Sequence, residues 1–130
     1  MAAGWEERAR ALAGTRFRAQ GRDAATGLDC AGLIIATFGL RANDYRHDYR
    51  LRGEHRAELV AAMARDFWRV PRTQSRAGDV LMLGVARDLL HLAVKTSAGF
   101  VHADAGLGKV VETPGSPKWK VLAAYRRRAR

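Results

Sequence analysis

The sequence predicts an α+β fold in which helices come first and an antiparallel sheet follows. Before residue 69 the apolar residues recur at helical spacing or fill an uninterrupted run, whereas from Gly78 onward short β-like runs alternate with turn residues. No helical segment separates the later runs, so the chain has no place for the crossover helices that parallel strands require. The length of 130 residues fits a single domain over residues 1–130 with one ordinary core.

The first helix is predicted over residues 5–13, where Trp5, Ala9 and Leu12 are available for one face. Charged residues interrupt this segment and no long apolar run is present, which differs from a secretory signal. Residues 14–27 are rich in glycine, arginine and polar side chains and are expected to form a loop.

A buried helix is predicted over residues 28–40, because this segment is apolar on every side apart from a single threonine. Thr26 and Asp29 have the spacing of a capping box, in which side chains at a helix start accept hydrogen bonds from its unpaired N–H groups. On either cap assignment, Cys30 falls close to the first helical turn. Gly39 marks the expected end of the helix.

The remaining elements follow from periodicity and turn residues. Residues 41–53 form a polar loop that carries aromatic side chains, and residues 54–68 return to helical spacing before a break at Val70-Pro71. The β-like runs are Asp79–Val85, Leu89–Lys95, Gly99–Ala103, Lys109–Glu112 and Val121–Arg126. Turn residues separate these runs, so we expect a meander of antiparallel strands.

The second and third β-like runs bring two histidines together. A two-residue turn at Ser97-Ala98 sets the register of this hairpin, and that register pairs His91 with Asp104. It also places His102 on the same face, as a diagonal neighbour of His91. A slip of one residue would move the two histidines to opposite faces of the sheet. The predicted site therefore requires this register of the hairpin.

Cys30 is the only cysteine, which excludes an internal disulfide. At a helix start, unpaired N–H groups and the helix dipole favour the thiolate, which is the reactive form of cysteine. If the buried helix packs on the histidine face, His91 would take the thiol proton, and His102 or Asp104 would fix its ring through the other nitrogen. The Cys30 N–H would then donate to the oxyanion of a tetrahedral intermediate.

Simpler interpretations of the same residues stand beside this one. A cysteine beside an apolar run also serves as packing, and a histidine between leucines also serves as a hydrogen-bonded residue of a sheet. One cysteine and scattered histidines lack the short ligand spacing of a metal site, so neither a metal nor another cofactor is expected. The residue types alone leave the function open.

The formal net charge of +10 and a pI near 11.0 predict attraction to polyanions, such as nucleic acid or the anionic polymers of a cell envelope. The basic residues are scattered along the chain, and the only true cluster is the run 126–130, for which we expect disorder. A nucleic-acid partner is therefore disfavoured relative to anionic envelope polymers. No stretch reaches the length of a membrane span.

Eight short motifs follow one another in a fixed order and extend through nearly the whole chain. They are Gly14–Phe17, Gly27–Leu33, Gly78–Leu81, His91–Val94, Phe100–Ala103, Lys109–Val111, Pro117–Lys120 and Tyr125–Arg127. In this order, and with eleven residues from His91 to His102, they resemble the NlpC-type cysteine peptidases, which cut peptides of the bacterial cell wall.

This resemblance implies a papain-like α+β fold, with the nucleophile helix packed on a C-terminal antiparallel sheet. It implies Cys30 as nucleophile, His91 as base, and His102 rather than Asp104 as the residue that orients the base. Family members hydrolyse amide bonds in peptidoglycan stem peptides, often between D-glutamate and diaminopimelate. The resemblance therefore implies a cell-wall hydrolase, a thiol protease that works through an acyl-enzyme intermediate.

The resemblance is weaker at the residues that would bind substrate. Asp29 keeps the carboxylate that resembles the family's amine-binding residue. Many members have a tyrosine where Phe17 stands and a serine where Ala31 stands, and neither residue found here can donate a side-chain hydrogen bond. Polar residues of the preceding loop are candidates to replace those contacts: Arg18, Gln20 and Arg22.

The short form of the chain, without a linker or a signal, resembles the peptidases encoded with phage tails or gene-transfer particles. A particle is then expected to carry a protein made in the cytoplasm to the cell wall or periplasm, with stem peptides and particle proteins as partners. Three rival functions remain open: a catalytically idle wall-binding or tail-assembly module, a basic nucleic-acid-binding domain, and a lipid or amide acyltransferase on the same fold.

Overall fold

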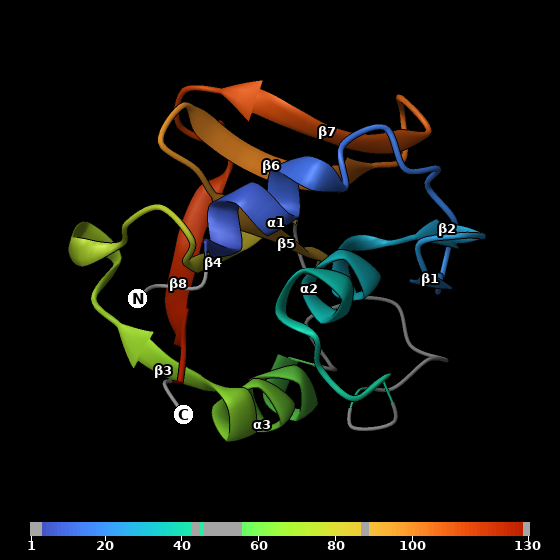
Figure 1. Cartoon of the computed structure of the whole chain (residues 1–130). Coiled ribbons are helices and arrows are strands. Elements are labelled where there is room, and N and C mark those ends of the chain that lie inside the picture. The colour runs from blue at the N-terminus through green and yellow to red at the C-terminus, as the bar shows by residue number, and fades with distance from the viewer. Residues whose placement is uncertain (1–3, 43–44, 46–55, 87–88, 129–130) are drawn as a thin grey trace.

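The computed structural model describes residues 4–42, 45, 56–86 and 89–128, and it has the expected α+β architecture (Figure 1). The helices are α1 (Trp5–Ala11), α2 (Cys30–Phe38) and α3 (Arg56–Asp66), with a short 3-10 helix η3 (Arg72–Gln74). The strands are β1 (Arg22–Asp23), β2 (Gly27–Leu28), β3 (Phe67–Val70), β4 (Val80–Ala86), β5 (Leu89–Lys95), β6 (Gly99–Asp104), β7 (Lys109–Pro114) and β8 (Lys120–Arg127).

Strands β3 to β8 form one six-stranded sheet in the order β3-β8-β4-β5-β6-β7, with every pair of neighbours antiparallel. The expected meander runs from β4 to β7, and β8 returns between β3 and β4. In the β5–β6 hairpin Val94 pairs with Val101 and Lys95 with Phe100. This is the register that a two-residue turn at Ser97-Ala98 predicts, so the hairpin prediction is confirmed.

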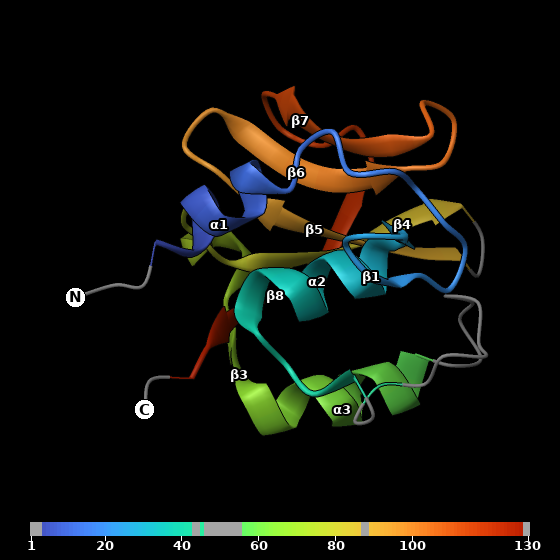
Figure 2. The same cartoon turned by 45° about the vertical axis from the view of Figure 1, so that its right-hand side comes forward.

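The three helices contribute to a main hydrophobic core, and α2 packs against β5 and β6 (Figures 1 and 2). Leu33 of α2, Met63 of α3 and Leu92 of β5 lie in this core and are almost completely buried. A smaller cluster, which includes Leu81 and Phe100, forms separately. None of the described helices has the length and apolar character needed to cross a membrane.

Helix α2 begins at Cys30 because Asp29 caps it, with Oδ1 of Asp29 accepting a hydrogen bond from the N–H of Gly32 at 2.8 Å. Of the two candidate caps, Asp29 is therefore the N-cap. The helix ends as expected at Gly39, which has φ of 65°. A Cβ atom at Gly32 would collide with the carbonyl oxygen of Gly21, so this glycine lets the preceding loop cross the helix start.

The helix predicted over residues 54–68 ends earlier than expected. Residues 56–66 are helical, but Phe67–Val70 form strand β3, which pairs with β8 from Phe67↔Arg127 to Val70↔Ala124. Four residues are too few to separate helical from strand periodicity, and the pairing partner lies far away in the sequence. Residues 54 and 55, and most of the loop predicted over 41–53, lie outside the described residues. The loop predicted over residues 14–27 contains the short β1–β2 pair.

The prediction of disorder at the C-terminus is wrong for residues 126–128. Arg126 and Arg127 belong to β8, and the Arg126 guanidinium donates two hydrogen bonds of 2.9 Å to the carboxylate of Asp79. Arg127 and Arg128 donate to main-chain carbonyl oxygens of α3. These arginines are ordered because strand pairing and hydrogen bonds to Asp79 and to α3 hold them. Residues 129 and 130 lie outside the described part.

Candidate active site

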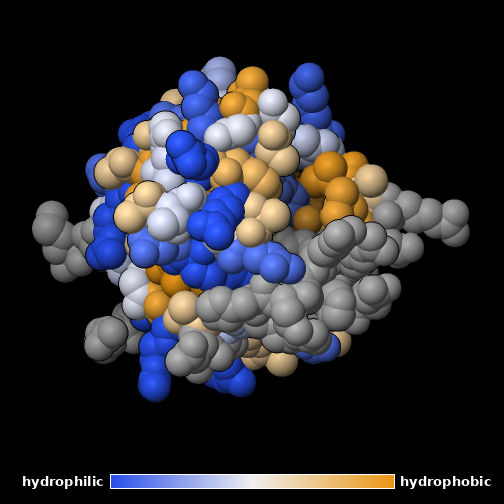
Figure 3. Space-filling view, turned by 90° about the vertical axis from the view of Figure 1, so that its right-hand side faces the viewer, coloured by the Kyte–Doolittle hydropathy of each residue, from blue (hydrophilic) through white to orange (hydrophobic). Residues whose placement is uncertain are grey.

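A pocket of about 620 Å³ lies where the start of α2 meets β5 and β6. Cys30, His91 and His102 all line it, as do Asp29 and Asp104. Figure 3 views the molecule from the side that carries β1 and β2, and a hydrophobic patch stands out there among hydrophilic surface. The fold thus gathers the three residues that the sequence singles out into one cavity.

Cys30 is the first residue of α2 and is only 7% exposed. The backbone groups of Leu92 and Ala31 form hydrogen bonds that favour its thiolate. Because Leu92 directly follows His91, the thiol lies against the segment of β5 that carries the candidate base. Within the described residues, no backbone or side-chain acceptor takes the Cys30 N–H, which is available to a ligand.

The two histidines form a direct hydrogen bond across the β5–β6 hairpin. Nε2 of His91 lies 2.9 Å from Nδ1 of His102. Nε2 of His102 in turn lies 3.2 Å from the hydroxyl oxygen of Thr113 on β7. A continuous chain of hydrogen-bond contacts therefore runs from the pocket into the sheet, through His91, His102 and Thr113.

Aromatic rings surround the histidine pair. The Trp119 ring packs edge-on against His91 and His102, with centroid separations of 5.6 and 5.8 Å. The ring centroid of Phe100 lies 4.9 Å from that of His102, which is on the same strand. These ring contacts restrict rotation of both imidazole planes.

Asp104 was the rival of His102 for orienting His91. The structure brings His102 into hydrogen-bond contact with His91, whereas Asp104 Oδ1 accepts from the N–H of Leu107 in the following turn. Asp104 still lines the pocket, and its charge opposes the lowering of both histidine pKa values that burial causes.

Burial dominates the protonation of the site. It raises the pKa of Cys30 to about 12, with the Asp29 charge adding to the rise, against the lowering effects of the Leu92 and Ala31 backbone groups and of Arg22. Burial also lowers the pKa of His91 to about 4, and the charge of His102 acts in the same direction. The pKa of His102 is lowered by burial as well.

The ligand-free site therefore holds a neutral thiol and neutral imidazoles near pH 7. The helix start was expected to favour a thiolate at Cys30, and this expectation is wrong for the resting site because desolvation outweighs the N–H groups. Among the described residues, no hydrogen bond joins the Cys30 thiol to His91. Since His91 Nε2 is engaged with His102, Nδ1 is the nitrogen that remains to accept the thiol proton.

Asp29 is more deeply engaged in the fold than the sequence suggests. Its Oδ1 accepts from Arg22 Nη1 at 2.7 Å as well as from Gly32, and its Oδ2 accepts from the N–H of Gln20 at 3.1 Å. Arg22 is buried, with 8% of its side chain exposed. The carboxylate beside the nucleophile is thus neutralised by the protein's own guanidinium.

The structure places some of the other candidate substrate-binding residues in the pocket wall and leaves one outside it. Phe17 and Gln20 line the pocket, as does Arg22, whereas Arg18 is not part of its wall. Phe17 is held by a bridge to Leu28 and packs partly against the main core. Arg18 was a candidate only because it is close to Cys30 in the sequence. At the turn of residues 18–21, the residues that follow Arg18 contribute to the pocket wall in its place.

Sequence reasoning missed Trp119 and Thr113 as neighbours of the histidines. Trp119 lies just before β8 and Thr113 near the end of β7, so only the pairing of distant strands brings them to His102. The aromatic residue in the motif Pro117–Lys120 was the one available signal. Among the described residues, no group of three or more histidine, cysteine or acidic side chains is arranged to hold a metal ion.

No protein-family model matches the chain, and no curated protein matches its sequence. Solved structures do match. The NlpC/p60 domain of the peptidoglycan hydrolase SagA aligns over 86% of this chain and 87% of that domain, with a TM-score of 0.60 and 20% identity. The P60 domain of the antigen MAP1204 from M. avium subspecies paratuberculosis aligns over 94% and 90%, with a TM-score of 0.58 and 19% identity.

These alignments show that the chain has the fold of NlpC/P60 domains over nearly its whole length. The papain-like α+β arrangement predicted from the motifs is therefore confirmed.

Proposed function

We propose that this protein is an NlpC-type cysteine peptidase that hydrolyses amide bonds in peptidoglycan stem peptides. The observation that carries the proposal is the convergence of Cys30, His91 and His102 on one pocket, with the two histidines in hydrogen-bond contact. The fold shared with a domain of a peptidoglycan hydrolase supports the substrate class. The reaction needs a nucleophile, a base and a residue that orients the base, and these three residues supply those groups.

In the acylation step, the Cys30 sulfur attacks the carbonyl carbon of the scissile amide while His91 Nδ1 takes the thiol proton. The carbonyl π electrons move to oxygen, and the Cys30 N–H donates to this oxyanion. When the tetrahedral intermediate collapses, the C–N bond breaks and the His91 proton passes to the leaving amine. A thioester between Cys30 and the acyl part of the peptide remains.

In the deacylation step, His91 Nδ1 takes a proton from water as the water oxygen attacks the thioester carbonyl. The C–S bond then breaks, and the proton on His91 passes to the Cys30 sulfur as the peptide carboxylic acid leaves and loses its own proton to solvent. The raised pKa of Cys30 and the lowered pKa of His91 favour proton transfer during attack over an ion pair formed in advance.

Substrate recognition is expected to involve Asp29, Phe17 and Gln20, which line the pocket near Cys30. An incoming amine would have to share the Asp29 carboxylate with Arg22. We therefore expect a stem-peptide amine to contribute less to binding here than it would at an unpaired carboxylate.

The test is digestion of purified murein by the wild type and by Cys30→Ala, with released peptides identified by mass spectrometry and new amino groups by labelling. Ser97→Ala, an exposed substitution outside the pocket, is the matched control. Wild type and Ser97→Ala should release peptides, and Cys30→Ala should release none above background. Equal release by all three proteins would sink the assignment.

The resting state of Cys30 favours a second candidate, a catalytically idle wall-binding module of the same fold. The raised pKa of the thiol is what an idle site would show. Such a module would sediment with murein, release no peptide, and bind equally well as Cys30→Ala. Peptide release by the wild type excludes it.

Action at the cell wall or periplasm, and delivery by a phage tail or gene-transfer particle, belong to the same proposal and rest on the resemblance alone. An antibody against the protein should detect it in purified particles from a producing strain. Its presence only in the soluble fraction of those cells would count against delivery by a particle.

A further inference from the structure

Within the described part of the chain, the charged residues that line the pocket are Asp29, Arg22 and Asp104. Asp29 and Arg22 form an ion pair of 2.7 Å, and the other donors to the Asp29 carboxylate are the N–H groups of Gly32 and Gln20. The charge of Asp29 is therefore balanced inside the protein. Asp104 differs, because no described arginine or lysine forms an ion pair with its carboxylate.

The Asp104 carboxylate is held in place by the turn between β6 and β7. Its Oδ1 accepts a hydrogen bond from the N–H of Leu107 at 3.0 Å, and its main-chain oxygen accepts one from Gly108 at 2.8 Å. The Gly108 carbonyl accepts from the N–H of Phe17 at 2.9 Å, so the turn is fixed to the loop that carries another residue of the pocket wall. Oδ2 of Asp104 has no donor among the described residues, and the side chain is only partly buried, so this oxygen is able to accept from a ligand.

Asp104 also lies close to the two histidines. It follows His102 by two residues on β6, so both side chains are on the same face of the sheet. The charge of Asp104 opposes the lowering of the pKa of both His91 and His102, so the carboxylate is near both rings. A substrate group bound at Asp104 would thus lie beside the residues proposed to carry out the reaction.

Lys109 is the cation that the strand pairing brings nearest to Asp104. The two residues are direct partners in the β6–β7 ladder, which puts their side chains on the same face. Lys109 is exposed, however, and forms no ion pair with Asp104. An exposed pair of this kind contributes little, so a cation held in the pocket can take its place.

We propose that Asp104 binds a primary ammonium group of the substrate and so selects peptides that carry one beside the β6–β7 turn. The proposal rests on the proposed cysteine-peptidase function. A carboxylate without a cationic partner favours an ammonium over a neutral donor, because charge-assisted hydrogen bonds are the stronger ones. In a stem peptide this group is either the N-terminal amine or the side-chain amine of a diamino acid, and the experiment separates the two.

The test compares cleavage of the peptide L-Ala-γ-D-Glu-diaminopimelate with cleavage of three derivatives, in which the N-terminal amine, the side-chain amine or both are acetylated. Asp104→Asn keeps an oxygen for the N–H of Leu107 and removes the charge. Asp23→Asn is the matched control, because Asp23 also accepts a backbone N–H in a turn but is not part of the pocket wall. The readout is the ratio of kcat/KM between free and acetylated peptide, in which any effect of Asp104 on the histidines cancels.

For the wild type and Asp23→Asn, acetylation of the recognised amine should lower kcat/KM about ten- to a hundredfold, as expected for one hydrogen bond to a charged group. For Asp104→Asn, the same acetylation should change kcat/KM by less than about twofold. Lys109→Gln should keep the preference of the wild type or increase it. A preference for the free amine that survives in Asp104→Asn would overturn the proposal, as would a wild type that cuts all four peptides equally well.

Binding measurements separate this proposal from the proposed function. Calorimetry with the same four peptides uses Cys30→Ala and the double variant Cys30→Ala/Asp104→Asn, neither of which cuts the peptide. If the wild type released no peptide from murein, but Cys30→Ala preferred the free amine and the double variant did not, the proposed function would fail and the role of Asp104 would stand. If murein were cut and both variants bound with the same preference, only the role of Asp104 would fail.

Discussion

The protonation of Cys30 depends on a competition between burial and backbone donors. Full burial disfavours the thiolate, and the adjacent Asp29 carboxylate disfavours it further, whereas the Leu92 and Ala31 backbone groups oppose both. The outcome could not be deduced from the sequence, because a helix start predicts the donors but not the depth of burial.

We predict that the alkylation rate of Cys30 keeps rising with pH through the alkaline range, because the pKa of the thiol is raised to about 12. The measurement is the rate of iodoacetamide reaction at pH 6 to 11, and it is unambiguous because the chain has one cysteine. The urea-unfolded protein is the control, and its alkylation rate should level off once the pH exceeds the ordinary pKa of a thiol. A plateau near neutral pH in the folded protein would instead indicate the preformed ion pair.

We also predict that the protein loses stability as the pH falls from about 6.5 to about 4. The pKa of His91 is lowered to about 4, so in this interval the unfolded chain binds a proton that the folded protein does not. Stability contributed by the neutral buried ring is present above the unfolded pKa and is lost on acidification. The loss is at most about 3 kcal/mol for His91, and His102 adds in the same direction.

The measurement is the free energy of unfolding in urea at pH 7, 6, 5 and 4.5 for the wild type and His91→Gln. Subtracting the two curves removes the carboxylates common to both proteins. The wild type should lose more free energy than His91→Gln over this range, and parallel curves would show that His91 titrates normally.

At the scale of elements, Asp29 couples the cap of α2 to the pocket wall. Its carboxylate accepts from Gly32, Gln20 and Arg22, so one side chain fixes the helix start, the preceding loop and a buried guanidinium. Cys30 thus lies at a helix end that Asp29 fixes both through a helix N–H and through contacts with the preceding loop.

We expect Asp29→Ala to lower the free energy of unfolding by about 2 kcal/mol or more, because the cap and the partner of Arg22 are lost together. Asp29→Asn, which keeps an oxygen for the Gly32 N–H, should cost less. Urea unfolding at pH 7 measures both, and Arg41→Ala, outside this network, is the control. Equal costs for Ala and Asn would mean that the cap hydrogen bond contributes little.

The sequence was most informative for elements that local pattern alone can specify. The apolar run of α2, its end at Gly39 and the alternation in β4 to β8 are all local, and these predictions are confirmed, except that the helix begins at Cys30 and Leu28 belongs to β2. Strand β3 could not be found in this way, since Phe67 and Trp68 continue the helical spacing and the segment becomes a strand only by pairing with β8. Thr113 and Trp119 escaped for the same reason, because strand pairing brings them to His102.

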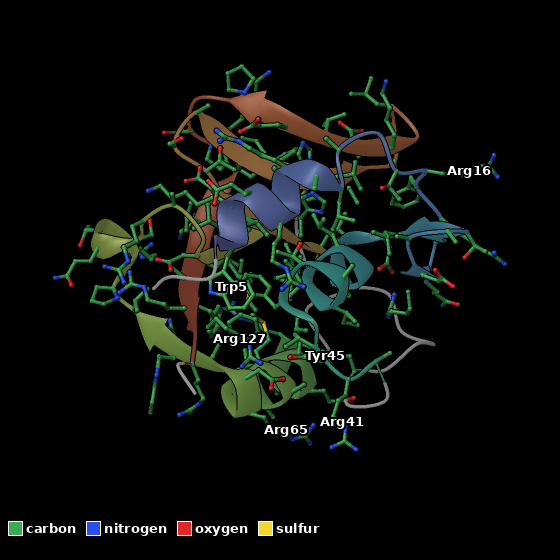
Figure 4. The ribbon with its side chains drawn as sticks, in the orientation of Figure 1. Trp5, Arg16, Arg41, Tyr45, Arg65 and Arg127 are labelled. Atoms are coloured by element: carbon green, nitrogen blue, oxygen red, sulfur yellow. The ribbon has the colours of Figure 1, made fainter. Side chains whose placement is uncertain are left out.

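At the scale of the whole molecule, the basic residues behind the net charge of +10 are scattered along the chain. Figure 4 shows Arg16 pointing outward on the side of β1 and β2, whereas Arg41 and Arg65 point outward at the bottom of the view, near α3. Arg127 instead turns toward α3, where Tyr45 also lies. This distribution gives no support to a single nucleic-acid interface and fits diffuse attraction to anionic polymers.

Asp79 and Arg126 form an ion pair where the start of β4 meets β8. Asp79, at the start of β4, is 2% exposed, and its carboxylate accepts two hydrogen bonds from Arg126 on β8 and one from the N–H of Arg76. Because β8 lies between β3 and β4, this ion pair fixes the last strand of the chain against the first strand of the meander.

We predict that Asp79→Ala lowers the free energy of unfolding by about 2 to 4 kcal/mol, since it leaves a bidentate arginine and a backbone N–H without their acceptor. Urea unfolding at pH 7 measures the loss, with the exposed substitution Lys118→Ala as control. Asp79 is not part of the pocket wall, so the folded fraction of Asp79→Ala should keep the kcat of the wild type at low temperature. A cost below about 0.5 kcal/mol would show that the pair is replaceable. A fall in kcat with the protein still folded would show that the β4–β8 junction also positions the histidines, although neither Asp79 nor Arg126 lines the pocket.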